Sequence, residues 1–409
     1  MPFIGFKKYL CGFVFRLLKQ LNVCLLLNAN NKPILNARFA NHISWQNVTT
    51  YYQLMNSKTQ INKPSPTVPG EIIIKFESTT DVRATIYAMK EGSSVIITDF
   101  YSNGMMLLKE LHKHLKNRLP NKTFSEQRAY RAEYHKLSNQ VFIEIVNQEV
   151  AVKKAPSIGW LEKFYPDNNK FYLTFPQVQG LNSAWQWYKN GIKVPVLRNK
   201  IHPFYGTYFP TRFDHLILFD NWLKRYKGAK KSAIDVGIGS GVLAFQMVQH
   251  GFQKVFGTDT NPNAIAGLKE SMGETKLSRK IELSDANLFG ELKNETELIV
   301  FNPPWLPAAS SLGKIDEAIY YNKNLFPKFF AEANNRLAKD GKLVILFSNL
   351  GQITKASKEH PIEKELAKGV RFQLEKCLKK SVKVASDKTK RDQHWRGTEE
   401  VELWVLVKK

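Results

Sequence analysis

The stretch Asp235-Val-Gly-Ile-Gly-Ser-Gly241 decides the fold of the second half of this chain. It follows a short apolar run and leads into the helical pattern of Val242–His250. Gly237, Gly239 and Gly241 allow positive φ angles and a close approach of the backbone, and the N-terminus of a helix exposes free N–H groups. A strand, a glycine loop and a helix in this order predict a ligand site at the carboxyl end of the strand.

Acidic residues stand at the ends of three successive predicted strands. Asp235 opens the glycine loop, Asp259 ends the strand that follows it, and Asp285 comes after the third strand. The alternation of strands and helices predicts a parallel α/β sheet, whose ligand sites lie at the carboxyl ends of its strands. Asp259 is placed to accept hydrogen bonds from ribose hydroxyls, and Asp285 to face an adenine amino group. Each of these two acids could instead cap a helix or a turn.

The fourth predicted strand ends in Asn302-Pro303-Pro304-Trp305. The two prolines remove two backbone N–H donors and keep the residues before them out of the α region. The result is a stiff turn that offers carbonyl groups, one carboxamide and an indole, and such a turn can hold a planar amino group. A strand-ending turn with a packed Trp is the plainer alternative when the turn is considered alone.

These motifs together resemble the class I S-adenosylmethionine-dependent methyltransferases, and most closely the HemK-like branch. That branch includes the glutamine-N5 and the adenine- or guanine-N methyltransferases. The resemblance covers about residues 195–409 and rests on four motifs in order, which are Asp235–Gly241, Thr258–Ala264, Ser284–Asp285 and Asn302–Trp305. It implies a Rossmann-like α/β sheet for this part, next to an additional α+β N-terminal domain.

The resemblance also implies which residues bind the cofactor, S-adenosylmethionine. The three glycines of the loop would cradle it, with its methionine end near Asp235. Asp259 would hold the ribose, and Asp285 with the backbone of Ala286 would face the adenine. Arg212 would belong to a lid over the cofactor. No metal site is predicted.

The acceptor side of the implied site is the Asn302–Trp305 turn. Asn302 Oδ1 and the Pro303 carbonyl would hold the amino group that is methylated, Pro304 would stiffen the turn, and Trp305 would stack on the acceptor. Most HemK-like proteins have Tyr or Phe at this last position. Trp305 therefore implies a wider stacking face or an acceptor slot of different shape.

The first half of the chain is more basic than the second and contains no recognisable catalytic pattern. We expect a domain over residues 1–195 and the catalytic domain over residues 196–409. Residues 1–200 contain 27 Lys and Arg against 12 Asp and Glu, and the net charge of the whole chain is +24. Such a surface attracts polyanions, although a generally Lys-rich proteome would give the same composition. Apolar patterns predict a strand over Val141–Val152 and, in the second half, a helix over about residues 315–337.

The apolar residues 9–27 do not form an uninterrupted span of the ~20 residues that a transmembrane helix needs. The polar residues that interrupt them are Arg16, Lys19, Gln20 and Asn22. The three cysteines are scattered and show neither metal-binding nor disulfide spacing, which favours a reducing compartment. We therefore expect a cytoplasmic protein without a transmembrane segment.

The sequence predicts an N-methyltransferase that acts on a planar amino or amide nitrogen of a macromolecule. The first hypothesis for the acceptor is a protein glutamine in a ribosome-associated factor. The second is an RNA or DNA base, which the basic first half favours; Trp185, Trp187 and Tyr188 could stack on a base or pack in a core. A small-molecule acceptor is disfavoured by the large extra domain. A non-enzymatic cofactor-binding module is the remaining alternative. It is disfavoured because no position of the four motifs has lost its functional residue. The sequence does not reveal the oligomeric state.

Overall fold

The computed structural model describes residues 25–27, 33–35, 61–120, 124–273, 275–293, 295–308, 320–382 and 398–409. The chain divides into two compact units, Met1–Gln60 and Ile61–Lys409. In the first unit, β1 (Leu25–Leu27) and β2 (Pro33–Leu35) pair in antiparallel fashion. Most of the apolar stretch at residues 9–27 lies outside the described residues. The boundary expected at residues 195 and 196 stays a prediction.

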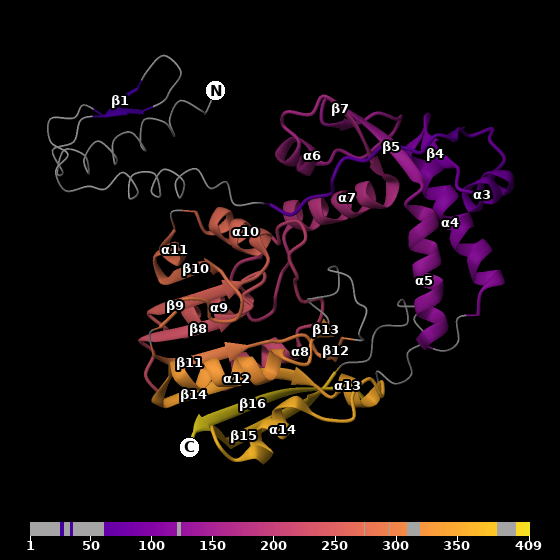
Figure 1. The fold of residues 1–409 in the computed structure, drawn as a ribbon. Helices are drawn as coiled ribbons and strands as arrows, with labels where there is room; N and C mark the ends of the chain where they lie inside the picture. Colours follow the sequence, from indigo (N-terminus) through magenta and orange to yellow (C-terminus); the bar gives the residue numbers. More distant parts are fainter. Residues whose placement is uncertain are drawn as a thin grey trace. The chain divides into compact units, whose positions relative to one another are not determined.

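A seven-stranded sheet forms the centre of the C-terminal half (Figure 1). Its strands are β8 (Ser232–Val236), β9 (Lys254–Asp259), β10 (Ile281–Asp285), β11 (Thr296–Phe301), β14 (Leu337–Ser348), β15 (Phe372–Ser381) and β16 (Glu400–Lys408). Their order is β10-β9-β8-β11-β14-β16-β15. The strands from β10 to β14 run parallel, and β16 runs antiparallel to both β14 and β15. The expected Rossmann-like parallel sheet is confirmed.

Helices cover both faces of this sheet, so its strands are apolar on both sides. The helices of this half are α8 (Asp214–Leu223), α9 (Val242–Gln249), α10 (Pro262–Met272), α11 (Lys276–Lys280), α12 (Leu325–Arg336), α13 (Leu350–Ile353) and α14 (Pro361–Lys368). On β8, Ala233 packs in the same cluster as residues of α8 and α9. The next residue, Ile234, packs in the cluster that contains α12 and α14. None of the helices in the described ranges combines the length and the apolar character needed to cross a bilayer.

The strand order reverses between β8 and β11, and this reversal positions the site. From β8 the chain proceeds outward to β9 and β10, and it then returns to add β11 and β14 on the other side of β8. Strands β8 and β11 are in register, with Phe301 opposite Val236. In open α/β sheets, ligands bind at such a switch point, beyond the carboxyl ends of the strands. The glycine loop and the Asn302 turn therefore start side by side.

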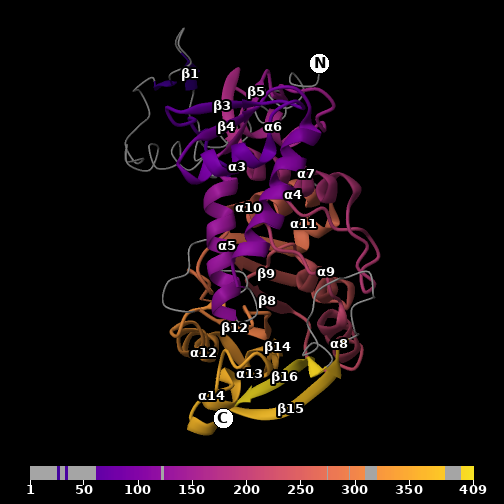
Figure 2. The same ribbon diagram turned by 90° about the vertical axis from the view of Figure 1, so that its right-hand side faces the viewer.

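A second, five-stranded sheet lies in the part of the chain before residue 175. Its strands are β3 (Ile73–Phe76), β4 (Ser94–Ile97), β5 (Val141–Val146), β6 (Glu149–Val150) and β7 (Lys170–Thr174), and its helices are α3 (Val82–Lys90), α4 (Tyr101–Arg118), α5 (Phe124–Ser138), α6 (Gly159–Phe164) and α7 (Phe175–Asn190). Strands β3, β4 and β5 are parallel, and β5 pairs antiparallel with β6 and β7. Helices α4 and α5 lie side by side (Figure 2), with the rings of His112 and Tyr130 5.6 Å apart.

Two of the predicted elements differ from the structure. The segment predicted as one strand over Val141–Val152 is the hairpin β5–β6, because Asn147 and Gln148 adopt positive φ angles of 50° and 61°. Of the helix predicted over about residues 315–337, residues 315–319 lie outside the described residues, and α12 begins at Leu325. Residues 320 and 321 instead form β13 (Tyr320–Tyr321), which pairs with β12 (Leu306–Pro307) directly after the Asn302 turn.

Candidate active site

The glycine loop adopts the backbone that its sequence predicts. Gly237, Gly239 and Gly241 have φ angles of 68°, 50° and 80°, a region that side chains with a Cβ rarely adopt. The Gly239 N–H donates to Asp259 Oδ2 at 2.8 Å, which ties the loop to the end of β9. A Cβ on Gly237 would have only the Phe301 ring near it, at 3.8 Å. Gly237 is itself exposed, so the loop is open to solvent at this residue.

Asp235 lies beneath this loop as a buried carboxyl group. Its side chain is 1% exposed, and Oδ2 accepts the N–H of Ala244 in the first turn of α9 at 2.9 Å. Oδ1 is buried and has no hydrogen-bond partner among the described residues. Burial raises the pKa of Asp235 to about 8; the Ala244 bond opposes this rise and the nearby Asp259 adds to it. A cationic group placed beside Oδ1 would stabilise the ionised form.

The two later acids occupy the edge of the sheet that the sequence predicts. Asp259 accepts the N–H groups of Gly239 and Asn261, each at 2.8 Å, and burial raises its pKa despite these bonds. Asp285 is exposed, and the N–H of Ala286 donates to the Asp259 carbonyl at 2.9 Å. The structure brings Asp259, Asp285 and Ala286 together beside the glycine loop. Their roles in ligand binding stay predictions.

The Asn302 turn leaves the sheet next to the glycine loop. Pro303 is buried, whereas Asn302, Pro304 and Trp305 are partly buried. The Trp305 indole N–H donates to Asn302 Oδ1 at 3.3 Å, and the ring packs against the cluster on the α12 face. Sequence reasoning assigned Trp305 only a stacking role. It did not foresee that this side chain binds the carboxamide oxygen that is expected to hold the acceptor.

An extended segment crosses this edge of the sheet before α8. Near its start, Asn263 Nδ2 and Asn261 Nδ2 donate to the carbonyls of Tyr205 and Gly206 at 2.7 and 2.8 Å. The carbonyl oxygen of Tyr208 lies 3.4 Å from where a Cβ on Gly239 would stand. We call residues 205–212 the strap, because they run from the turn after β9 past the glycine loop.

Arg212 lies at the far end of the strap. Its Nη1 donates to Glu399 Oε2 at 2.7 Å, and Glu399 is itself buried immediately before β16. The structure therefore places Arg212 in an ion pair that anchors the strap, and its expected contact with a cofactor stays a prediction. Glu399 was not foreseen, because no local pattern links it to a residue 187 positions earlier.

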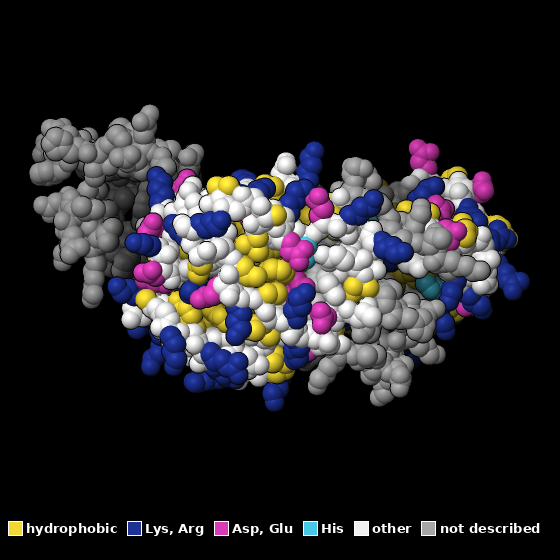
Figure 3. Space-filling view, turned by 90° about the horizontal axis from the view of Figure 1, so that it is seen from below, with side chains coloured by type: hydrophobic (Ala, Val, Ile, Leu, Met, Phe, Trp, Pro, Cys, Tyr) yellow, Lys and Arg dark blue, Asp and Glu magenta, His cyan; other side chains and the backbone are white. Residues whose placement is uncertain are grey.

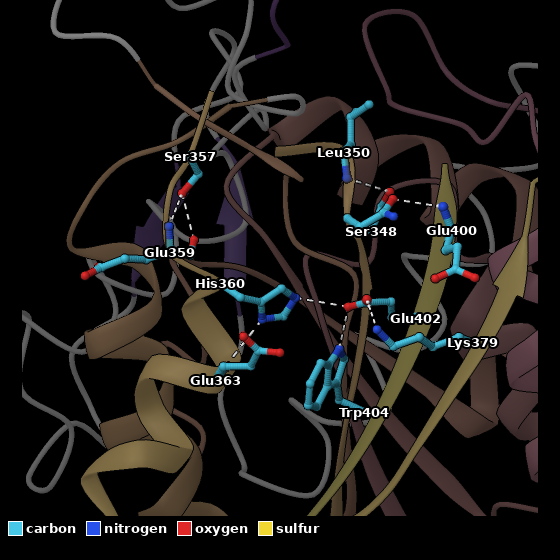
Figure 4. A network of polar contacts seen from close by, with 11 residues as sticks. Ser348, Leu350, Ser357, Glu359, His360, Glu363, Lys379, Glu400, Glu402 and Trp404 are labelled. Atoms are coloured by element: carbon cyan, nitrogen blue, oxygen red, sulfur yellow. Dashed lines mark hydrogen bonds and ion pairs between the residues drawn. The ribbon is translucent and has the colours of Figure 1, made fainter. Parts of the chain in front are cut away.

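A second cluster of polar side chains lies near the end of β14, and sequence reasoning missed it as well (Figure 4). The buried Glu402 on β16 accepts hydrogen bonds from His360 Nε2 at 3.0 Å and Trp404 Nε1 at 2.9 Å, and pairs with Lys379 Nζ at 3.0 Å. Burial alone would raise its pKa, but these partners outweigh burial and hold the pKa at about 2. With its oxygens bound in this way, Glu402 joins α14 to the antiparallel strands as a structural group.

His215, in the first turn of α8, contacts the predicted acceptor turn and was also missed by sequence reasoning. It is 2% exposed, and neither ring nitrogen has a hydrogen-bond partner in the described part of the chain. Its ring contacts Trp305 in a T-shaped arrangement, with 5.5 Å between centroids and 88° between planes. Burial lowers the pKa of His215 to about 4, so the imidazole is neutral near pH 7.

The comparison with protein families identifies this half of the chain. Residues 216–368 match the family model of the methyltransferase small domain. This region is a methyltransferase domain. A putative protein N5-glutamine methyltransferase from Methanocaldococcus jannaschii is 28% identical over 167 residues, which cover 39% of this chain and 80% of that protein. A ribosomal protein L11 methyltransferase from Geobacillus kaustophilus is 25% identical over 169 residues, which cover 37% of this chain and 54% of that protein.

Solved structures of methyltransferases also resemble about half of this chain. The ribosomal protein L11 methylase of Lactobacillus delbrueckii has a TM-score of 0.32 at 18% identity, over 50% of this chain and 81% of that one. The 16S rRNA N2 G1207 methyltransferase of T. Thermophilus, in complex with AdoMet and guanosine, has a TM-score of 0.34 at 16% identity, over 54% of this chain and 49% of that one.

The methyltransferase domain uses S-adenosylmethionine as methyl donor, and the residues at the switch point fit that molecule. The unpartnered Oδ1 of Asp235 suits an ammonium group, and the open side of Gly237 leaves room for close approach of a ligand. The exposed carboxylate of Asp285 is free to face an amino group at the outer end of the same edge. Asp235, Asp259 and Asp285 stand at the ends of the neighbouring strands β8, β9 and β10. This order suits a ligand that consists of an amino acid, a ribose and an adenine.

Proposed function

We propose that this protein transfers the methyl group of S-adenosylmethionine to a planar amino or amide nitrogen of a macromolecule. The first candidate acceptor is a glutamine side chain of a protein, in a ribosome-associated factor. The observation that carries the proposal is the register of β8 and β11, in which Phe301 stands opposite Val236. Because of this register, the glycine loop and the Asn302 turn begin at adjacent strand ends. One acceptor nitrogen can therefore approach both.

The chemistry follows from the groups at the turn. An amide or exocyclic amino nitrogen is a poor nucleophile because its lone pair is delocalised. Asn302 Oδ1 and the Pro303 carbonyl can accept its two N–H bonds, draw it toward tetrahedral geometry and stabilise the positive charge that develops. A nitrogen held in line with the methyl group gains up to ~7–11 kcal/mol from proximity in favourable cases. The new N–C bond forms as the S–C bond breaks, and the nitrogen then releases its proton.

We assign acceptor recognition to the region before the methyltransferase domain. Described residues of that region contact α10, the helix that follows the Asp259 turn. Glu270 on α10 contacts both Lys163 Nζ and the Tyr188 hydroxyl. The buried Asn263 on the same helix binds the backbone of Asn62 through Oδ1 and Nδ2, each at 2.7 Å. These contacts support a recognition domain held beside the site.

An RNA or DNA base is the second candidate, and two observations favour it. Residues 1–200 contain 27 Lys and Arg against 12 Asp and Glu. Trp187 is 47% exposed, and its ring lies 5.7 Å from that of Phe209 in the strap, whereas Trp185 and Tyr188 pack against a core cluster. However, Lys and Arg are scattered over the face seen in Figure 3 rather than gathered in one track.

The experiment that tests the proposal is transfer of tritiated methyl groups from S-adenosylmethionine into fractionated cell extract. A protein acceptor predicts label that resists nuclease and is lost with protease, and a nucleic-acid base predicts the reverse. Label in neither kind of macromolecule would overturn the proposal.

Asn302→Ala provides the matching active-site variant. We expect the affinity for S-adenosylmethionine to stay near that of the wild type. Turnover should fall by about 10²–10³-fold, which is the loss typical of removing one hydrogen-bonding group that stabilises charge in the transition state. Asn117→Ala changes an exposed residue of α4 and serves as the control. Equal labelling by Asn302→Ala and the control would remove the acceptor role of the turn.

A further inference from the structure

The hydrogen bond between Trp305 and Asn302 fixes the orientation of the carboxamide. An indole N–H can only donate, so the Asn302 atom that it meets at 3.3 Å must be the oxygen. Without such a partner, the carboxamide of an asparagine can rotate by about 180°, which exchanges Oδ1 and Nδ2 with little change in shape. An amino group can be held only by the oxygen, and the bond from Trp305 therefore selects the orientation that is useful for the proposed reaction.

This bond leaves the oxygen able to bind a second donor. A carboxamide oxygen has two lone pairs, and the indole N–H uses one of them. The backbone around Asn302 is already stiff, because Pro303 and Pro304 fix φ at two successive positions. The rotation of the Asn302 side chain is then the main freedom left at the turn, and Trp305 removes it. Phe at this position would stack equally well but would lack the N–H.

Trp305 is held in turn by His215. The imidazole contacts the indole in a T-shaped arrangement at 5.5 Å between centroids. His215 is 2% exposed and lies in the first turn of α8, which packs on the sheet, so its ring is fixed by the core. Its ring nitrogens have no hydrogen-bond partner within the described ranges, which leaves ring packing as its visible interaction. A neutral ring in this place limits the tilt of the indole.

We propose that Trp305 and His215 are positioning residues, which set the Asn302 carboxamide before the acceptor arrives. Trp305 acts through its N–H, and His215 acts by packing against the indole. This inference rests on the proposed function, because it assumes that Asn302 Oδ1 holds the reacting nitrogen. It adds a hydrogen-bond role for Trp305 beside the expected stacking, and a role for a residue outside the turn.

The first test separates the N–H of Trp305 from its ring. Trp305→Phe keeps an aromatic ring and removes the donor. Calorimetry should give an S-adenosylmethionine affinity within about twofold of the wild type, while kcat for tritium transfer into the accepting fraction falls by about ten- to a hundredfold with little change in KM. Wild-type kcat in this variant would overturn the hydrogen-bond role.

The second test uses two replacements of His215. His215→Phe retains a ring against Trp305, and His215→Ala removes it. We expect wild-type kcat in the first variant and a reduced kcat in the second, with S-adenosylmethionine affinity unchanged in both. Equal kcat in His215→Ala and the wild type would overturn the role of His215. Equal loss in both variants would overturn ring packing as its mode of action.

A third measurement does not need an acceptor. In the ¹⁵N-labelled full chain, Asn302→Ala should shift one indole N–H resonance and speed its hydrogen exchange, and Trp305→Phe should delete that same resonance. Failure to find any methylated fraction would count against the proposed function and would leave this measurement valid. An indole resonance that does not respond to Asn302→Ala would overturn the positioning inference by itself.

Discussion

At the scale of single residues, the buried carboxyl group of Asp235 links the cofactor site to stability. The unfolded chain ionises Asp235 near its ordinary pKa of 3.8, whereas the folded chain ionises it only near 8. The folded protein thus binds more protons between these two values. The contribution of this carboxyl to stability is complete below about pH 4, and it is lost as the pH rises toward 8.

Asp235→Asn should remove this pH dependence. The carboxamide has nearly the same shape, does not ionise, and keeps an oxygen for the Ala244 N–H. We expect the midpoint of thermal unfolding, relative to that of the wild type, to be higher at about pH 8 than at about pH 5. The measurement is calorimetry of both proteins at both pH values. A relative midpoint that does not change with pH would contradict the raised pKa of Asp235.

Asp259 is the residue on which the ribose assignment depends. Asp259→Ala removes the expected acceptor of ribose hydroxyls and also frees the Gly239 N–H, which the carboxylate now binds. A hydrogen bond to a charged group contributes about 1.5–3 kcal/mol, so the dissociation constant for S-adenosylmethionine should rise by at least about tenfold. Titration calorimetry measures this change, and Asp167→Ala at an exposed turn is the control. Unchanged affinity would exclude the ribose role.

At the scale of elements, one asparagine connects three segments near the site. Asn263 in the first turn of α10 is fully buried, and its carboxamide binds the N–H and the carbonyl of Asn62 as well as the carbonyl of Tyr205. Asn263→Ala would leave these three backbone groups without their partner. Each buried unsatisfied group costs about 1–3 kcal/mol, and we therefore expect a clear loss of stability.

Denaturant unfolding of Asn263→Ala beside Asn117→Ala measures this loss. We expect a lower midpoint for Asn263→Ala and an unchanged one for the control, since Asn117 is exposed on α4. Because the strap starts at Tyr205, limited proteolysis should also cleave residues 205–212 faster in the variant. Equal midpoints and equal cleavage would show that the carboxamide does not anchor the strap.

The elements also show which parts of the structure a sequence can predict. The glycine loop and α9, which was expected over Val242–His250 and spans Val242–Gln249, were predicted closely, because turn chemistry and hydrophobic periodicity are local signals. The hairpin at Asn147 and Gln148 was missed because neither residue is a glycine, the usual mark of a positive φ. The contacts of Trp305 with His215, and of Arg212 with Glu399, could not be predicted, since they join distant parts of the chain only after folding.

At the scale of the whole molecule, the net charge of +24 makes binding to RNA an expected property even if the acceptor is a protein. Neutralising backbone phosphates releases counterions, and a protein with 6–10 phosphate contacts loses about 10³–10⁵ in affinity between 50 and 200 mM salt. We expect a steep decline of this kind for a random-sequence RNA oligonucleotide, measured by fluorescence anisotropy of the full chain. The kcat of methyl transfer to a protein acceptor should change little over the same range, because Asn302 and the glycine loop act within the partly buried switch point. An RNA affinity that stays the same between about 50 and 200 mM salt would show that the Lys and Arg side chains do not form a set of contacts with backbone phosphates. Methyl transfer to RNA with a kcat/KM that falls in parallel with RNA affinity would instead favour the nucleic-acid acceptor.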